Sequence, residues 1–225
     1  MGATTDPIVV EAIIKKLEDL PVKVYVVESN STMTNADKAF EVTGMKDVCE
    51  RNCVEWLNLR YIKDRVKLAV PNGEVLKSIT MICLVTESAV ISAAKLKTHL
   101  NTTLTLGMKN MFGFLPDKVK AKYHMKDISN VMVDINTVLK PAFTVIDGFV
   151  GMEGLGPVDR TPVQMDLIIA GTDPVATDAT AVRIMGFNPH EIKHIRKAYE
   201  KGLGHGDAQV VGEKLEIVKR MLKRK

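Results

Sequence analysis

Residues 89–99, Ala-Val-Ile-Ser-Ala-Ala-Lys-Leu-Lys-Thr-His, begin as an uncharged apolar run and become polar after Ala94. The apolar part predicts a buried strand. Lys95, Lys97 and His99 alternate along the continuation, so an extended chain places them on the same side. Because ligands in open α/β sheets bind beyond the carboxyl ends of the strands, this transition predicts a ligand site where the strand ends.

Apolar segments of the same kind recur along the chain and alternate with helical patterns. The expected strands include Lys23–Glu28, Ser78–Leu84, Phe143–Asp147 and Leu167–Gly171, and the expected helices include Pro7–Leu20, Met45–Glu55, Asp127–Leu139, Asp173–Met185 and Pro189–Lys201. This alternation predicts an α/β fold with a mostly parallel central sheet and helices on both faces. Pro71-Asn-Gly-Glu74 predicts a tight turn, so a small β-hairpin region is expected near residues 56–77. A glycine-rich loop is expected over Gly148–Pro162.

No low-complexity linker divides the chain, which predicts one α/β domain over residues 1–225. The start is unusual, because residues 2–7 form a loop that leads directly into a helix. Either Met1 is a true start or an N-terminal strand is lacking. The tail, residues 214–225, is rich in lysine and arginine and predicts an amphipathic terminal helix with a solvated basic face.

Composition narrows the functional classes. The chain is 46% hydrophobic and 26% charged, as is ordinary for a soluble globular protein. Nucleic-acid binding is disfavoured, because much of the net charge of +4 comes from the tail and only 5% of residues are aromatic. Without a signal peptide or an apolar stretch of about 18 residues, a cytoplasmic protein outside the membrane is expected. Cys49, Cys53 and Cys83 are then expected to be reduced core thiols.

The polar junction after the first strand supplies the main candidate site. Lys109 interrupts an otherwise apolar segment, where an unpaired charge is costly. Ammonium groups and hydroxyls suit a phosphate or carboxylate ligand. His99 and Lys109 are therefore candidate catalytic residues, and the candidate ligand-binding residues beside them are Lys95, Lys97, Thr102 and Asn110. The alternative is that the lysines lie on the surface and His99 satisfies a core hydrogen bond.

One expected strand ends at an acid, Asp147, and four glycines and a second acid, Glu153, follow it. Glycines let a backbone approach a ligand closely, and the acids suit a metal, ligand hydroxyls or the lysines. The glycine spacing does not fit the dinucleotide-binding fingerprint, and no phosphate-binding loop is present. The candidate ligand-binding residues in this segment are Asp147, Gly148, Glu153 and Gly154.

Asp173 and His124 complete the candidate set. Asp173 lies at a strand-to-helix junction, where a helix N-terminus suits an anion, although the acid itself is the favoured cap. His124 is a candidate proton carrier near neutral pH, and the alternative is an ordinary loop histidine. The three cysteines do not form a complete iron–sulfur motif, so the cofactor is left undetermined and no metal ligands are assigned.

Several motifs together resemble the domain-of-unknown-function family numbered 362. They are Lys95-Leu-Lys-Thr-His99, Met108-Lys-Asn-Met-Phe-Gly113, Asp147-Gly148, Glu153-Gly-x-Gly-Pro157 and Thr172-Asp-Pro-Val-Ala-Thr-Asp-Ala179. The resemblance covers nearly the whole chain and is of a kind seen in iron–sulfur-associated prokaryotic proteins. Many such relatives carry ferredoxin-like modules that bind [4Fe–4S] centres, which implies a ferredoxin-like partner here.

Two functional hypotheses follow. In the first, the chain binds a small anionic ligand at the carboxyl edge of the sheet, as an enzyme coupled to an iron–sulfur partner. Lys95, Lys97 and Lys109 would hold the anion, His99 or His124 would move a proton, and Asp147 and Glu153 would orient the substrate. In the second, the same residues form a buried ion network in a non-catalytic binding or assembly module. Catalysis and homo-oligomer formation are left open.

Overall fold

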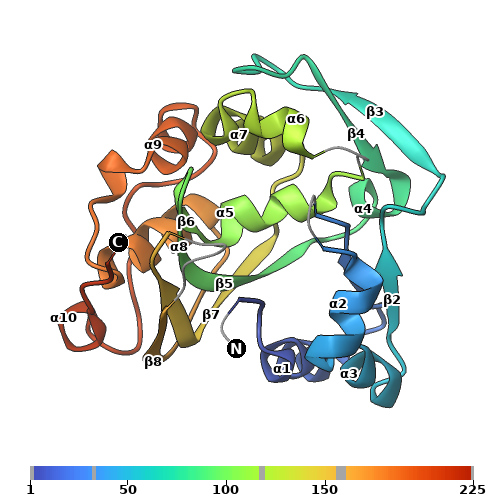
Figure 1. Ribbon diagram of the computed structural model, residues 1–225, viewed down its shortest axis with the longest axis horizontal. Helices are drawn as coiled ribbons and strands as arrows, with labels where there is room; N and C mark the ends of the chain where they lie inside the picture. The colour runs from blue at the N-terminus through green and yellow to red at the C-terminus, as the bar shows by residue number, and fades with distance from the viewer. Residues whose placement is uncertain (1–2, 32–33, 117–119, 156–160, 224–225) are drawn as a thin grey trace.

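The computed structural model describes residues 3–31, 34–116, 120–155 and 161–223, except the side chains of Ala121 and His124. Within these residues the central sheet has the strand order β6-β5-β7-β8 (Figure 1). The strands are β5 (Ile91–His99), β6 (Thr103–Thr105), β7 (Phe143–Glu153) and β8 (Thr161–Gly171). The α/β class is confirmed.

The central sheet is mixed, so the expectation of a mostly parallel sheet is wrong. β5 and β7 are parallel, whereas β6 pairs antiparallel with β5 and β8 pairs antiparallel with β7. The cause is the segment after Asp147, which was expected to be a loop. It continues as strand to Glu153, with a register shift between Gly148 and Val150, and β8 returns alongside it. An adjacent antiparallel strand needs no helical crossover.

Two smaller sheets flank this one. β1 (Tyr25–Glu28) pairs parallel with β2 (Glu55–Asn58), and β3 (Arg65–Ala69) pairs antiparallel with β4 (Ser78–Ile82). The hairpin therefore lies over residues 65–82, later than expected. Residues 55–58, which were expected in or near the hairpin, form β2 and pair with β1 instead. The segment expected as a separate strand over residues 78–84 supplies the second strand of the hairpin.

The helix boundaries follow local capping signals. Asp6, Asn35, Asp127 and Asp173 each accept a backbone N–H at a helix start, as the sequence predicts for short polar side chains. The helices of at least seven residues are α1 (Pro7–Leu17), α2 (Ala36–Thr43), α3 (Met45–Arg51), α7 (Ile128–Val138), α8 (Pro174–Ile184) and α9 (Lys193–Glu200). The shorter ones are α4 (Cys83–Thr86), α5 (Gly107–Asn110), α6 (Ala121–His124), α10 (Leu215–Val218) and the 3₁₀ turns η1 (Met111–Phe114) and η2 (Pro189–Glu191).

Over its described residues, 214–223, the basic tail forms only the four-residue α10, so the expected terminal helix is wrong over its greater part. Leu222 is buried, and the backbone N–H groups of Arg220 and Leu222 donate to carbonyls at the end of α8. These two hydrogen bonds and the burial of Leu222 hold the segment against α8 without helical hydrogen bonds of its own. None of the described helices is long and apolar enough to cross a bilayer.

The apolar core has two large parts, with β5 and α5 near their junction. One packs α8 and α9 against the central sheet, with Ala94, Leu96 and Met108 among its buried members. The other lies beneath the β3–β4 hairpin and includes Met111 and α7 residues. Figure 1 shows α5 on one side of β5 and α1 on the other. This arrangement holds the polar junction of residues 95–113 at the centre of the molecule.

Candidate functional site

Lys95 and Asp147 form a buried ion pair between the two parallel strands. They are register partners on β5 and β7, and Lys95 Nζ lies 2.7 Å from Asp147 Oδ2. The side chains are 5% and 0% exposed. The same carboxylate accepts the N–H of Asp6 at 2.7 Å and that of Phe149 at 3.0 Å. Both charges are thus satisfied within the protein, which leaves this pair little capacity for a ligand.

Three other lysines converge nearby. Lys97 Nζ donates to the carbonyl of Ala3 at 2.7 Å, and Lys120 Nζ donates to Ser29 Oγ at 2.5 Å. Lys109 lies half-buried on α5 and forms no hydrogen bond or ion pair with any residue that the structure describes. Burial, and then the charges of Lys97 and Lys120, lower the pKa of Lys109 to about 8. We call Lys97, Lys109 and Lys120 the lysine cluster.

Two buried polar side chains beside α5 were missed at the level of the sequence. His194 on α9 is fully buried, and neither ring nitrogen has a hydrogen-bond partner among the described residues. Burial and the charge of Lys109 lower the pKa of His194 to about 3. Asn136 on α7 donates to the carbonyl of Met108 at 3.0 Å, while its Oδ1 has no partner in the described part of the chain. The signal was available, because His194 falls on the core-facing side of an expected helix with Ile195 and Ala198.

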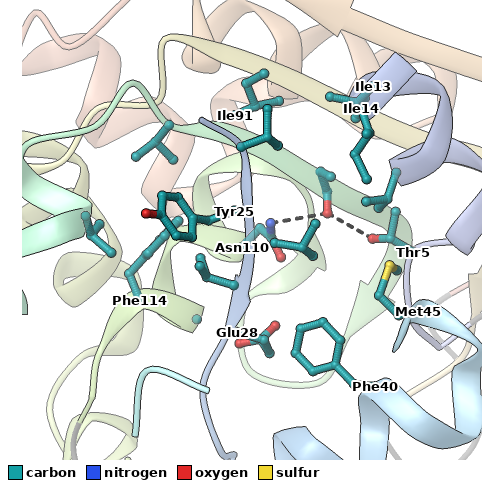
Figure 2. A pocket seen from close by; sticks show the side chains of 18 of the residues that line it. Thr5, Ile13, Ile14, Tyr25, Glu28, Phe40, Met45, Ile91, Asn110 and Phe114 are labelled. Carbon is teal, nitrogen blue, oxygen red and sulfur yellow. Dashed lines mark hydrogen bonds between the residues drawn. The ribbon is translucent and has the colours of Figure 1, made fainter. Parts of the chain in front are cut away.

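A cavity of about 780 Å³ opens between β1 and β5. Its polar lining includes Thr5, Glu28, Lys97, Thr105 and Asn110. The remainder is mostly apolar, and Figure 2 shows the side chains of Ile13, Ile14, Phe40, Met45, Ile91 and Phe114 around it. The cavity therefore joins an apolar chamber to the end of the sheet that carries Lys97.

Asn110 and His99 have local structural partners. Asn110 Nδ2 donates to Ser92 Oγ at 3.2 Å and to the carbonyl of Ala93 at 3.3 Å. His99 Nδ1 accepts the N–H of Asn101 at 3.1 Å within the tight turn between β5 and β6. In the same turn Thr102 is buried, and its hydroxyl donates to the Leu104 carbonyl at 2.9 Å. These contacts shape the rim, and the ligand-binding and catalytic roles of the three residues stay predictions.

Glu153 and Gly154 are tied to the end of the chain. Glu153 Oε2 accepts the N–H of Lys223 at 2.7 Å, and the Gly154 N–H donates to the Lys223 carbonyl at 3.0 Å. Thr98 Oγ1 donates to the carbonyl of Gly154 at 2.7 Å. Within the described residues the Glu153 carboxylate pairs with no side-chain cation. The structure thus gives these two residues a docking contact that the sequence did not reveal.

Gly148 serves close packing between strands. A Cβ at this position would lie 2.6 Å from Leu167 Cδ1 and 3.0 Å from the Leu167 carbonyl oxygen, so a larger residue would require the Leu167 side chain to move and the β8 backbone to adjust slightly. The side chain of His124 lies outside the described residues, and its predicted role has no structural counterpart here.

Asp173 is the N-cap of α8, as expected from its position before Pro174. Its Oδ1 accepts the N–H groups of Val175 and Ala176 at 2.9 and 3.0 Å. Its Oδ2 lies 2.8 Å from the N–H of His205 and 2.9 Å from the ring Nδ1 of the same residue. The backbone donors of the helix start are therefore occupied by the protein's own carboxylate.

Asp178 on α8 is a second fully buried acid. It accepts the N–H groups of Gly107 and Met108 at 2.8 and 2.9 Å, and so fixes the start of α5. Burial raises the pKa of Asp178 to about 7, against the opposing effect of these two donors. The acid thereby helps to place Lys109 one residue farther along.

The cysteines and the acids form no metal site in the described ranges. The three thiols are free, with Cys49 buried and Cys53 exposed, so the expectation that all are core residues is wrong for Cys53. Cys53 follows α3 with a φ of 53°, which turns it out of the helix. No group of three or more His, Cys, Asp or Glu side chains is placed to hold a metal among the residues described.

Comparison with known proteins identifies relatives of this chain. One is the thylakoid-associated protein sll1697 of Synechocystis sp., which is 32% identical over 127 residues. The aligned part is 54% of this chain and 40% of that relative, so the match spans less than half of the relative's length. No solved structure matches. The model of the family described as "Domain of unknown function (DUF362)" matches residues 1–183, and the chain therefore belongs to this family.

Proposed function

We propose that the chain binds a small anion, a phosphate or a carboxylate, at the lysine cluster. One observation carries the proposal: the ammonium of Lys109 is half-buried, lacks a partner among the described residues, and lies within the field of Lys97 and Lys120. Removing a cation from water without a counter-charge is unfavourable. An anion that contacts Lys109 would supply the missing charge.

The electrostatics of the cluster support an anion rather than a cation or a neutral ligand. The pKa of Lys109 falls to about 8 because the protonated form is desolvated and repelled by two neighbouring ammonium groups. A bound anion reverses this effect and favours the protonated lysine. Binding at pH 8 to 9 should therefore be accompanied by uptake of a proton at Lys109.

For Lys95 and Asp147 the structure supports the other hypothesis, that of a buried ion network without a ligand. Lys95 and Asp147 satisfy each other, and the Asp147 carboxylate accepts two further backbone N–H groups, which is how a structural ion network behaves. We therefore assign Lys95 and Asp147 to holding β5, β7 and the start of α1 together. Lys97 and Lys109 keep the ligand-binding role.

The proposal also includes a proton carrier for catalysis, a ferredoxin-like iron–sulfur partner and a cytoplasmic location. His194 is a further candidate proton carrier, because it is an imidazole without a partner in the described region and lies within the field of Lys109. The ferredoxin-like partner rests on the family resemblance. The relative is named for its thylakoid association, and cell fractionation of this chain would test the expected cytoplasmic location.

The anion site is tested by thermal shift and calorimetry with inorganic phosphate, succinate and citrate, against chloride at matched ionic strength. At least one of the three should raise Tm and should bind with proton uptake at pH 8.5. Lys109→Met should abolish both effects. The matched control is Lys67→Met, since Lys67 is an exposed lysine on β3 and should leave both effects unchanged. An equal anion response in Lys109→Met would overturn the proposed site.

A further inference from the structure

Two strand edges without neighbours face the same cavity. The carbonyl of Glu28 accepts the N–H of Leu59 at 2.8 Å, which directs Glu28 toward β2. Backbone groups of successive strand residues point to opposite edges, so Tyr25 and Val27 direct theirs away from β2. No described strand pairs with β1 on that side.

The edge of β5 is free in the same way. The carbonyl of Val90 accepts the N–H of Ala142 at 2.8 Å on the β7 side, so Ile91 and Ala93 direct their backbone groups to the other edge. β6 covers that edge only from Lys97 to His99. Over the described residues, the first part of β5 therefore has β7 on one edge and no strand on the other.

On this edge of β5, side chains rather than a neighbouring strand donate hydrogen bonds to the backbone. The carbonyl of Ala93 accepts the hydroxyl of Thr5 at 2.9 Å and the amide of Asn110 at 3.3 Å. Figure 2 shows Thr5 and Asn110 reaching toward one point at the wall of the cavity. A backbone N–H of a neighbouring strand would donate to the same oxygen. Two side chains thus meet a requirement that sheets normally meet with a strand.

The cavity between the two edges has the size and lining of a strand site. Its volume is about 780 Å³, and residues of both β1 and β5 line it. α1 and α2 supply apolar side chains from Ile14, Ala39 and Phe40. A segment as long as β1 would extend about 13 Å and present side chains to both faces. A lipid or a small apolar molecule would fill the chamber but would offer no hydrogen bonds to the backbone groups of Tyr25, Val27 and Ile91 that face it.

We propose that this cavity is a docking groove for an extended apolar segment of another polypeptide, four to six residues long. The segment hydrogen-bonds to β1 on one side and to β5 on the other, in the mode of strand addition. Its side chains pack against α1, α2 and the apolar lining. Docking joins the β1–β2 pair to the central sheet and removes two exposed edges. The inference rests on the two strand edges and not on the charge of Lys109, although Lys97 of the lysine cluster lines the same cavity.

The test is residue-resolved amide exchange with a probe peptide, acetyl-Val-Thr-Val-Ile-Val-Lys-amide. Saturating peptide should slow exchange at least tenfold at the four residues that face the groove: Tyr25, Val27, Ile91 and Ala93. The neighbours Val26 and Ser92 already face β2 and β7 and should change little. A peptide with proline in place of isoleucine is the matched control, because it lacks a donor and should not protect.

Two variants sharpen the test. Ala39→Trp places a bulky side chain in the groove and should abolish the protection, whereas Ala12→Trp, on the exposed side of α1 and outside the groove, should preserve it. The proposal is overturned if the four groove-facing amides are as protected as Val26 and Ser92 in the free protein. It is also overturned if the peptide fails to protect them, protects all six alike, or acts equally in Ala39→Trp.

Discussion

Lys95 and Lys97 lie two residues apart on the same strand, yet the structure treats their charges differently. Lys95 meets a carboxylate that is fixed by two further backbone donors, and the pair is buried. Lys97 meets the carbonyl of Ala3 and lies within the field of Lys109. The difference teaches that two lysines on one strand end acquire different partners, according to the groups that the fold places opposite each of them.

The largest effect is expected from breaking the ion pair. Asp147→Ala leaves the Lys95 ammonium and two backbone donors unpaired in the interior and should cost about 3–5 kcal/mol in the free energy of unfolding. Urea denaturation measures this loss. The double variant Lys95→Met/Asp147→Asn should recover more than half of it, because no charge is left and the amide oxygen still accepts. A loss below about 1 kcal/mol for Asp147→Ala would contradict a structural role.

A buried carboxylate without a lysine sharpens the comparison. The pKa of Asp178 is raised to about 7 in the folded state and is near 4 when unfolded, so the folded state holds the proton more tightly between these values. Stability should therefore fall as pH rises from 4 to 7, by on the order of 3 kcal/mol, and level off above pH 7. Urea denaturation across this range measures the slope. Asp178→Asn should flatten it, and an unchanged slope would exclude Asp178 as its source.

Removing Lys109, which has no partner among the described residues, should raise the stability of the protein, whereas removing Asp147 should lower it. Lys109→Met relieves repulsion within the lysine cluster and should raise Tm of the anion-free protein at pH 7 by about 2–4 °C. The folded pKa near 8 lies below the unfolded value near 10.5, so the unmodified protein should gain stability as pH rises from 8 to 10.5. The variant should lack this gain in thermal scans. A lower Tm in Lys109→Met would mean that Lys109 supports the fold.

The smallest effect is expected at an exposed pair with good geometry. Lys23 precedes β1 by two residues, and its Nζ lies 2.6 Å from Oε1 of Glu55 on β2, with side chains 63% and 55% exposed. Solvent screens such pairs, so Lys23→Met should move Tm by less than about 1 °C. Thermal scans at low and high salt check this. A larger, salt-dependent loss would show that distance, rather than burial, separates the two classes of lysine.

The features of the fold that could be predicted are those set by interactions between residues close together in the sequence. The cap at Asp173 was identifiable, because a short acid before Pro174 can accept the N–H groups two and three residues later. The apolar run that forms β5 was identifiable from composition. The continuation of β7 beyond Asp147 was not, because its glycines resemble a loop until β8 supplies the hydrogen bonds.

The candidate site was only half predictable for the same reason. The sequence by itself determined which side chains bring charge to residues 95–113, since an ammonium inside an apolar segment must find a counter-charge, a hydrogen bond or water. Only the tertiary structure decided that Asp147 neutralises Lys95, that Glu153 binds the C-terminal segment, and that His194 lies within the field of Lys109. These outcomes depend on strand register and helix packing, which join residues far apart in the chain and leave no local pattern.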